Sequence, residues 1–488
     1  MKKIIAAGLC ILAILIAILL VNTWRYKAET PSVSEVTLLL ADETAPVERL
    51  AAAIRIKTIS FEDETHMDTH AFVSFHRFLE DAFPAIHEQL DRNMIHDYSL
   101  LYKWEGSNPA LKPMALLAHF DVVPVEPGTE NSWTHPAFSG EIADGFVWGR
   151  GTLDMKASLL AIMESIEILV QQGFQPERTL YLALGHDEET GGLKGAANIV
   201  SLLKKNGVEL AFTLDEGMFI LDKELSPSKK PLAIIGLAEK GYVTLRITAK
   251  GQGGHSSMPP AKTALGSLGR AIAALEKNQM PSSLAGPVKY LFDAIGPDLP
   301  FGQKLVFANQ WAFKPLILKI LEKMKTTNAM IRTTTAPTVI SGGVKANVLP
   351  ASAYALVNFR ILPGDTVKEV ITHVQNVIDD PDIEISIEGK EGIDPSPVSS
   401  PTAEDFRQIQ RTIMEIFPGT GVAPGLVMAG TDSKHYTRIS DNCYRFAPFV
   451  LGPEDTFRIH GTNERVLIKN YLDAIRYYTQ LIKNTSKK

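Results

Sequence analysis

Three apolar segments that each end in acidic or imidazole side chains constrain the fold more than any other feature of the sequence. They are MALLAHFD at 114–121, LYLALGHDEE at 180–189 and LAFTLDEG at 210–217. Runs that are apolar at successive positions are typical of strands buried on both faces, as in a parallel sheet. The segment 155–173 carries apolar side chains at helical spacing, which predicts a helix between the first two strands. This alternation predicts an α/β domain with a mostly parallel central sheet flanked by helices.

The side chains best suited to catalysis or metal binding lie at the ends of these strands. In open α/β sheets, ligands gather beyond the carboxyl ends of the strands. Asp187, Glu188 and Glu189 follow the second strand directly. Like charges this close resist burial unless something offsets them, so the segment is either a solvated turn or the neighbour of a cationic centre. His119 and Asp121 share one face of the first strand, where the carboxylate can orient the imidazole as a metal ligand.

A change in the hydrophobic pattern of the sequence after residue 240 indicates an inserted domain. Residues 241–251 alternate apolar and polar side chains, as a strand with one wet face does. A helix is predicted around 261–278 and another strand over 354–362, so the sequence predicts a small α+β lid domain at 241–362. The catalytic domain is then expected to comprise residues 45–240 and 363–488.

The N-terminus is apolar and precedes a mostly polar tether. No charged residue occurs from Ile4 to Trp24, a run close to the roughly 20 residues that cross a bilayer. We expect residues 1–44 to form an uncleaved membrane anchor and tether, with the catalytic domain outside the cytoplasm. A cleaved signal peptide, which would give a secreted protein, is the alternative.

Charge and cysteine content exclude several classes of function. The formal net charge of −6 provides no basic footprint, so we expect no nucleic-acid partner. Cys10 and Cys443 are the only cysteines, which excludes a disulfide framework and a cysteine zinc cluster. No G-x-S-x-G motif occurs, which argues against a serine hydrolase.

Further candidate ligands are weak singly and stronger together. Asp154 precedes a predicted helix and could be only its N-cap, Asp215 ends a predicted strand, and His460 could be an ordinary loop histidine. Imidazole and carboxylate ligands suit zinc. A pair of zinc ions about 3.5–4 Å apart can activate a bridging water and polarise a carbonyl oxygen. The combined set favours such a hydrolytic centre.

The order of these motifs carries a family resemblance. H-x-D, G-x-x-D-M-K, E-E-x-x-G, D-E-G and a C-terminal histidine follow one another as in the aminoacylase and carboxypeptidase family of di-zinc metallopeptidases. The segments NAMIRTTTAPT, GVKANVLP and GTDSKHY most resemble its carboxypeptidase S group. The resemblance implies two Zn²⁺ ions and a cis peptide after the bridging aspartate, at Asp154–Met155. It implies these metal ligands: Asp154 as the bridge, His119 and Asp215 at one ion, and Glu189 and His460 at the other.

The same resemblance assigns the catalytic and substrate-binding roles. Glu188 would be the general base and Asp121 would orient His119. The lid motif GQGGHSSMPP would supply His255 to stabilise the oxyanion, often from a partner subunit, so a homodimer through the lid is possible. Substrate contacts would come from Asn347, Arg360 and Gly430, with Arg360 holding a substrate carboxylate. Asp187 receives no role.

The expected activity is zinc-dependent hydrolysis of the amide bond of N-acyl amino acids, long-chain fatty-acyl ones included. The alternatives are a carboxypeptidase or dipeptidase acting on small peptides, and an inactive scaffold. The scaffold is disfavoured because every expected metal and base position is filled. Aromatic residues in 289–324 could form an apolar groove for an acyl chain, or could be lid core or dimer contacts.

Overall fold

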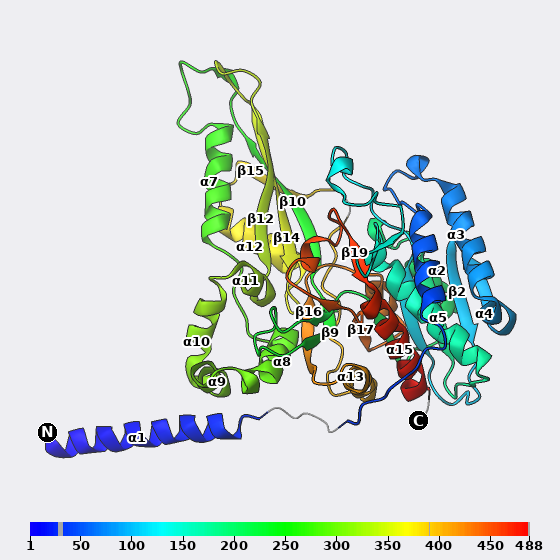
Figure 1. Cartoon of the computed structure of the whole chain (residues 1–488). Helices are drawn as coiled ribbons and strands as arrows, with labels where there is room; N and C mark the ends of the chain where they lie inside the picture. The colour runs from blue at the N-terminus through cyan, green and yellow to red at the C-terminus, as the bar shows by residue number, and fades with distance from the viewer. Residues whose placement is uncertain (28–32, 390, 487–488) are drawn as a thin grey trace.

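The catalytic domain is built on one mixed sheet. The computed structural model describes residues 1–27, 33–389 and 391–486 (Figure 1). The strands run in the order β1-β2-β6-β3-β7-β17-β9-β8-β18, and β16 pairs with β9. Their bounds are β1 Asp91–Ile95, β2 Ser99–Trp104, β3 Met114–His119, β6 Leu180–Gly185, β7 Phe212–Asp215, β8 Ile220–Leu221, β9 Leu232–Glu239, β16 Gly421–Val427, β17 Cys443–Arg445 and β18 Val450–Leu451. A separate small sheet contains β4 Glu141–Ala143, β5 Phe146–Trp148 and β19 Arg465–Leu467.

The three apolar runs form the centre of this sheet, as predicted. β3 pairs in parallel with β6 on one side and β7 on the other. Alternate residues of β3 enter different cores: Leu116 lies in the larger hydrophobic cluster and Leu117 in the smaller one. Burial on both faces explains why the runs are apolar at every position. The α/β fold class is therefore confirmed, although β1, β2, β8 and β9 add antiparallel pairs.

Helices cover both faces of the sheet. α2, α5, α13 and α15 pack together over the larger cluster, and α6 and α14 lie over the smaller one. The predicted helix between the first two runs is α5, which begins at Ala157. The catalytic-domain helices are α2 Thr44–Arg55, α3 Thr69–Ala82, α4 Pro84–Gln89, α5 Ala157–Gln171, α6 Ala196–Lys205, α13 Glu404–Ile416, α14 Ser433–Tyr436 and α15 Ile468–Thr485.

The lid is an antiparallel sheet in the order β12-β14-β10-β15, with α7 and α12 packed on it. Its elements are β10 Gly241–Lys250, α7 Ala264–Lys277, β12 Thr334–Gly342, β14 Ser352–Ile361, α12 Val367–Ile378 and β15 Ile383–Ile387, and a short pair joins β11 Gly254–His255 to β13 Val348–Leu349. The expected lid end at residue 362 is too early. β15 pairs with β10, and Val370 and Val374 of α12 lie in the lid core.

Four helices inserted between α7 and β12 belong to neither layer of the lid. They are α8 Gly286–Ile295, α9 Phe301–Ala308, α10 Gln310–Leu321 and α11 Lys325–Ile331. Their buried side chains share a hydrophobic cluster with Leu232 and Ile234 of β9 and with Leu426 of β16. Phe292 and Phe307 stack in this cluster with ring centroids 4.8 Å apart, whereas Phe301 and Trp311 are exposed. The aromatic residues of 289–324 thus divide between a core against the catalytic sheet and the surface.

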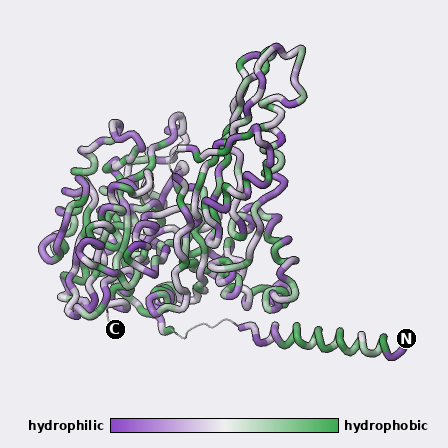
Figure 2. The backbone as a smooth tube through the Cα atoms, turned by 180° about the vertical axis from the view of Figure 1, so that it is seen from behind, coloured by the Kyte–Doolittle hydropathy of each residue, from purple (hydrophilic) through white to green (hydrophobic). Residues whose placement is uncertain are grey.

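The N-terminal helix α1 Lys2–Arg25 projects from the body, and it is long and apolar enough to cross a membrane (Figures 1 and 2). Its C-terminal end contacts α9. Val36 donates a backbone hydrogen bond to Glu415, and Arg476 donates to the carbonyl of Leu38. The described part of the predicted tether is therefore attached to α13 and α15.

Candidate metal centre

His119, at the end of β3, lies between two carboxylates from different elements. Its Nε2 is 3.1 Å from Asp154 Oδ1 and 3.1 Å from Glu216 Oε1. Asp154 belongs to the turn 152–156 before α5, and Glu216 follows β7 directly. The peptide bond Asp154–Met155 is cis. The parallel register of β3 and β7 brings the ends of these strands together, as the sequence pattern predicts.

His460 forms the other half of the cluster. Its Nε2 is 3.0 Å from Asp154 Oδ2 and 3.1 Å from Glu189 Oε2. Asp154 therefore has one oxygen toward each histidine. In the structure without metal ions, Asp154 and Glu189 raise the pKa of His460 to about 10 by hydrogen bonding to its ring. His460 has a φ of +60°, a conformation that is uncommon for residues other than glycine.

Glu188 lies beside the cluster in the short turn Glu188–Thr190 after β6. Burial raises the pKa of its carboxyl well above the ordinary value, and the charges of Asp432, Glu216 and Glu189 add to this effect. A desolvated carboxyl with a raised pKa is suited to accept a proton near neutral pH.

Asp121 holds the turn and the histidine together. Its Oδ1 is 3.3 Å from His119 Nδ1, and its carboxylate accepts hydrogen bonds from the backbone N–H groups of Glu188 and Glu189. The hydroxyl of Ser60 donates to the same carboxylate at 2.7 Å. One buried carboxylate thus positions residues from two neighbouring strand ends.

Asp215 does not lie where the resemblance places a ligand. Its Oδ1 accepts the backbone N–H of Glu216 at 2.9 Å, and its Oδ2 accepts that of Ser433 at 2.8 Å. The neighbouring Glu216 is the residue whose carboxylate contacts His119. The ligand role expected of Asp215 is therefore corrected to one of positioning, because Glu216 and not Asp215 contacts His119 and joins the possible metal-ligand groups.

A buried ion pair that was not predicted from the sequence connects two of the segments that carry the cluster. Glu464 accepts the backbone N–H of Leu153 and pairs with Arg150, and Arg150 also donates to the carbonyl of His460. This pair therefore fixes the turn of Asp154 and the loop of His460 relative to each other. Glu464 ends the segment RIHGTNE at 458–464, so its position four residues after His460 was the available signal.

The donor set fits metal ions. Ligand atoms of His119, Asp154 and Glu189 lie within 4.8 Å of one another, as do those of His119, Glu188 and Glu216. Oε1 of Glu189 is buried without a hydrogen-bond partner. Burial raises the pKa of Glu189 and of Glu216, as it does that of Glu188. A cation would offset this concentration of buried carboxylates, and the mixture of imidazole and carboxylate suits zinc.

The predicted substrate-binding residues lie outside the cluster. His255 is exposed on β11, where its Nδ1 contacts the hydroxyl of Ser257, and the carbonyl of Asn347 accepts the N–H of Ser256 nearby. Arg360 is exposed on β14, with its guanidinium 4.8 Å from the ring centre of Tyr242. A Cβ at Gly430 would be 3.8 Å from Oε2 of the buried Glu239. Within the described ranges, none of these residues hydrogen-bonds to the cluster.

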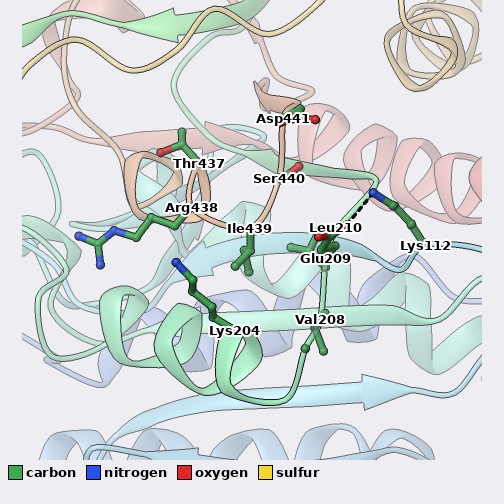
Figure 3. Close-up of a pocket in the computed structure, with 11 residues that line it drawn as sticks. Lys112, Lys204, Val208, Glu209, Leu210, Thr437, Arg438, Ile439, Ser440 and Asp441 are labelled. Atoms are coloured by element: carbon green, nitrogen blue, oxygen red, sulfur yellow. Dashed lines mark hydrogen bonds and ion pairs between the residues drawn. The ribbon is translucent and has the colours of Figure 1, made fainter.

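Asp187 has a structural role. Its carboxylate accepts the backbone N–H groups of Lys194 and Gly195, both at 2.8 Å, and thereby fixes the loop before α6. A surface pocket of about 300 Å³ lies at the other end of α6. Figure 3 shows its lining, in which charged and polar side chains mix with Val208, Leu210 and Ile439, and Lys112 pairs with Glu209. This pocket contains no residue of the metal-ligand cluster.

The fold and the cluster together define a metal-dependent hydrolase of amide or peptide bonds. Residues 115–484 match the model of peptidase family M20/M25/M40, and the chain belongs to this family. It is 42% identical to a probable carboxypeptidase S-like protein of Dictyostelium discoideum, covering 99% of the chain and 94% of that protein. It is also 42% identical to an N-fatty-acyl-amino acid synthase/hydrolase of Xenopus tropicalis, covering 99% of the chain and 95% of that protein. An M20 family metallo-carboxypeptidase of Sulfolobus solfataricus has the same fold, with a TM-score of 0.64 at 17% identity over 90% of this chain and 98% of that one.

Proposed function

We propose that the protein hydrolyses the amide bond of N-acyl amino acids, long-chain fatty-acyl ones included, and releases a free amino acid and a carboxylate. The observation that carries the reaction type is the partly buried carboxyl of Glu188, whose pKa is raised by desolvation, beside a cluster of two histidines and three carboxylates. The acyl amino acid as substrate is supported by the similarity to the Xenopus synthase/hydrolase.

The metal ligands in this proposal are His119, Asp154, Glu189, Glu216 and His460. Two zinc ions held by these residues would polarise the scissile carbonyl and lower the pKa of a bound water. Glu188 accepts the proton of the attacking water and transfers it to the leaving amine. Asp121 keeps His119 in the orientation that leaves Nε2 free for the cluster.

The lid supplies the remaining contacts of the proposal. Arg360 binds the substrate carboxylate, for which a planar guanidinium is well suited. Lys240 lies close enough that Arg360 contributes to lowering its pKa, after the larger effect of burial, while the charge of Asp365 acts in the opposite direction. His255 is exposed on the lid and would donate to the oxyanion after lid closure or from the lid of a second subunit.

We infer that α1 is an uncleaved membrane anchor. Asn309 is fully buried and its side-chain amide donates to the carbonyl of Leu19 at 3.1 Å, while it accepts from Asn22 at 2.9 Å. The hydroxyl of Tyr26 donates to the carbonyl of Phe292 at 2.9 Å. Removal of α1 as a signal peptide would expose this contact surface, whereas an anchor retains it.

A hydrolysis panel tests the proposed substrate. Purified full-length enzyme with zinc is given fatty-acyl, acetyl and peptidyl derivatives of one amino acid, and the released amine is measured. The proposal expects the highest kcat/KM for the fatty-acyl compound. A preference for the peptidyl compounds would support a carboxypeptidase or dipeptidase instead, as in the similarity to the Dictyostelium protein.

A further inference from the structure

The exposed apolar side chains of α9, α10 and the residues that follow form a surface that no part of the described chain covers. Phe301, Trp311, Leu316, Ile320 and Met324 are between 47% and 64% exposed, and we call them the apolar strip. Leu316 and Ile320 are four residues apart and therefore share one side of α10, and Met324 lies in the turn between α10 and α11. An exposed group of large apolar side chains this dense indicates an interaction surface.

The charges around the apolar strip are mostly positive. Residues 301–324 contain Lys304, Lys314, Lys319 and Lys323 and one acidic residue, Glu322, which pairs with Arg332, although the whole chain has a formal net charge of −6. Lys314 and Lys319 are exposed. Helices that combine lysine with Trp, Phe and Leu in this way are typical of segments that lie in the interface of a bilayer with anionic lipids.

The position of α1 indicates which surface the strip faces. Asn309, between α9 and α10, hydrogen-bonds to Leu19 and Asn22 near the C-terminal end of α1. Trp24 follows this contact and is 72% exposed, and Trp311, two residues after Asn309, is 62% exposed. Tryptophan is enriched where a spanning helix leaves the hydrocarbon region, so Trp24 marks that level of the bilayer and Trp311 lies near it. In Figure 1, α10 runs across the direction of α1 along the edge from which α1 projects.

We propose that α9 and α10 rest on the surface of the bilayer that α1 crosses, with the apolar strip in the acyl-headgroup boundary and the lysines at anionic headgroups. The inference rests on the proposed anchoring by α1. It does not depend on the proposed substrate, because the apolar strip and the lysines do not belong to the metal-ligand cluster.

Site-directed spin labelling of the full-length chain in vesicles containing anionic phospholipid tests this contact of α9 and α10 with the bilayer. Ile320→Cys is labelled in a Cys10→Ala background, where Cys443 is buried. Met94→Cys is the matched control, since Met94 is 62% exposed on β1 at the opposite edge of the catalytic sheet. The proposal expects the label at Ile320 to collide rarely with a water-soluble nickel complex and often with oxygen. The label at Met94 should collide often with nickel and less with oxygen.

A label at the native Cys10 tests the insertion of α1 separately from the contact of α9 and α10 with the bilayer. A label at Cys10 in the otherwise unmodified chain reports whether α1 is in the bilayer. If Cys10 is protected from nickel but Ile320 is as accessible as Met94, the contact of α9 and α10 with the bilayer is disproved and the anchoring by α1 is retained. If Cys10 itself is in water, both are disproved. Protection of Ile320 from both reagents, with dipolar coupling between copies, would identify a second copy as the occupant and overturn the proposal.

Lys314→Glu combined with Lys319→Glu tests the electrostatic part. The proposal expects the Ile320 label to regain nickel accessibility in anionic vesicles, because two attractive contacts become repulsive. An unchanged accessibility in these vesicles would contradict the role assigned to the lysines.

Discussion

At the scale of single residues, the centre depends on which carboxylates are free and which are already occupied. Burial raises the pKa of Glu188, Glu216 and Asp215 alike. Asp215 and Asp121 differ from the two glutamates because both of their carboxylate oxygens accept backbone N–H groups. Carboxylates that accept backbone N–H groups in this way position other residues, and the two glutamates are available for protons or metal ions. Residue type alone does not distinguish the two groups.

Glu188→Gln should lower kcat by about 10²- to 10⁴-fold, because the amide cannot accept the proton of the attacking water. Zinc content, measured by elemental analysis after dialysis, should stay near that of the wild type. Loss of metal together with activity would make Glu188 a ligand instead of the base.

Glu216→Gln and Asp215→Asn form a matched pair that tests the corrected ligand assignment. We expect Glu216→Gln to lose zinc to a weak chelator, since its carboxylate contacts His119. Asp215→Asn should retain zinc and lower the free energy of unfolding by about 1–3 kcal/mol, because a buried backbone N–H loses its acceptor. The opposite pattern of zinc retention would restore Asp215 as the ligand.

Zinc uptake should release protons and strengthen as the pH rises. The pKa of about 10 for His460 without metal means that its ring carries a proton at pH 7. Because a metal ligand must be neutral imidazole, lowering the pH favours the proton over zinc. Calorimetric titration in two buffers of different ionisation enthalpy measures the protons released, and His460→Ala should release fewer.

At the scale of elements, Asp121 connects β3 to the turn after β6. Asp121→Asn replaces an acceptor with a donor that faces two backbone N–H groups, so the turn carrying Glu188 and Glu189 should shift. We expect zinc affinity to fall by about 10- to 100-fold, as for other groups that orient metal ligands. Ser60→Ala, which removes one donor to the same carboxylate, is the control and should have a much smaller effect in the same competition assay.

Elements with strong periodicity were predictable and their partners were not. The apolar runs of β3, β6 and β7 predicted the centre of the sheet because burial on both faces leaves a clear pattern. α12 and β15 carry ordinary helix and strand patterns, and only pairing with β10 shows that they belong to the lid. The choice between Asp215 and Glu216 depends on the N–H of Ser433, a residue distant in sequence. Local pattern does not contain such contacts.

At the scale of the whole molecule, the proposed mechanism requires the lid and the catalytic domain to contact the same substrate. Arg360→Ala should raise KM for substrates with a free carboxylate by about 10- to 150-fold, the equivalent of about 1.5–3 kcal/mol for charge-assisted hydrogen bonds. Amidated analogues should be unaffected. Arg246→Ala is the matched control, since Arg246 also stacks on a tyrosine of the lid sheet but pairs with Glu388. Equal losses on amidated analogues would remove the role assigned to Arg360.

The four helices α8–α11 lie in the chain between α7 and β12, both of which belong to the lid. Lys240, at the junction of β9 and β10, also donates to the carbonyls of Ala329 and Arg332 at the end of this segment. A bilayer that holds α9 and α10 would therefore act mechanically on the lid through covalent connections on both sides. Turnover by the reconstituted enzyme would then depend on the lateral pressure of the lipid, as well as on the amount of substrate dissolved in it.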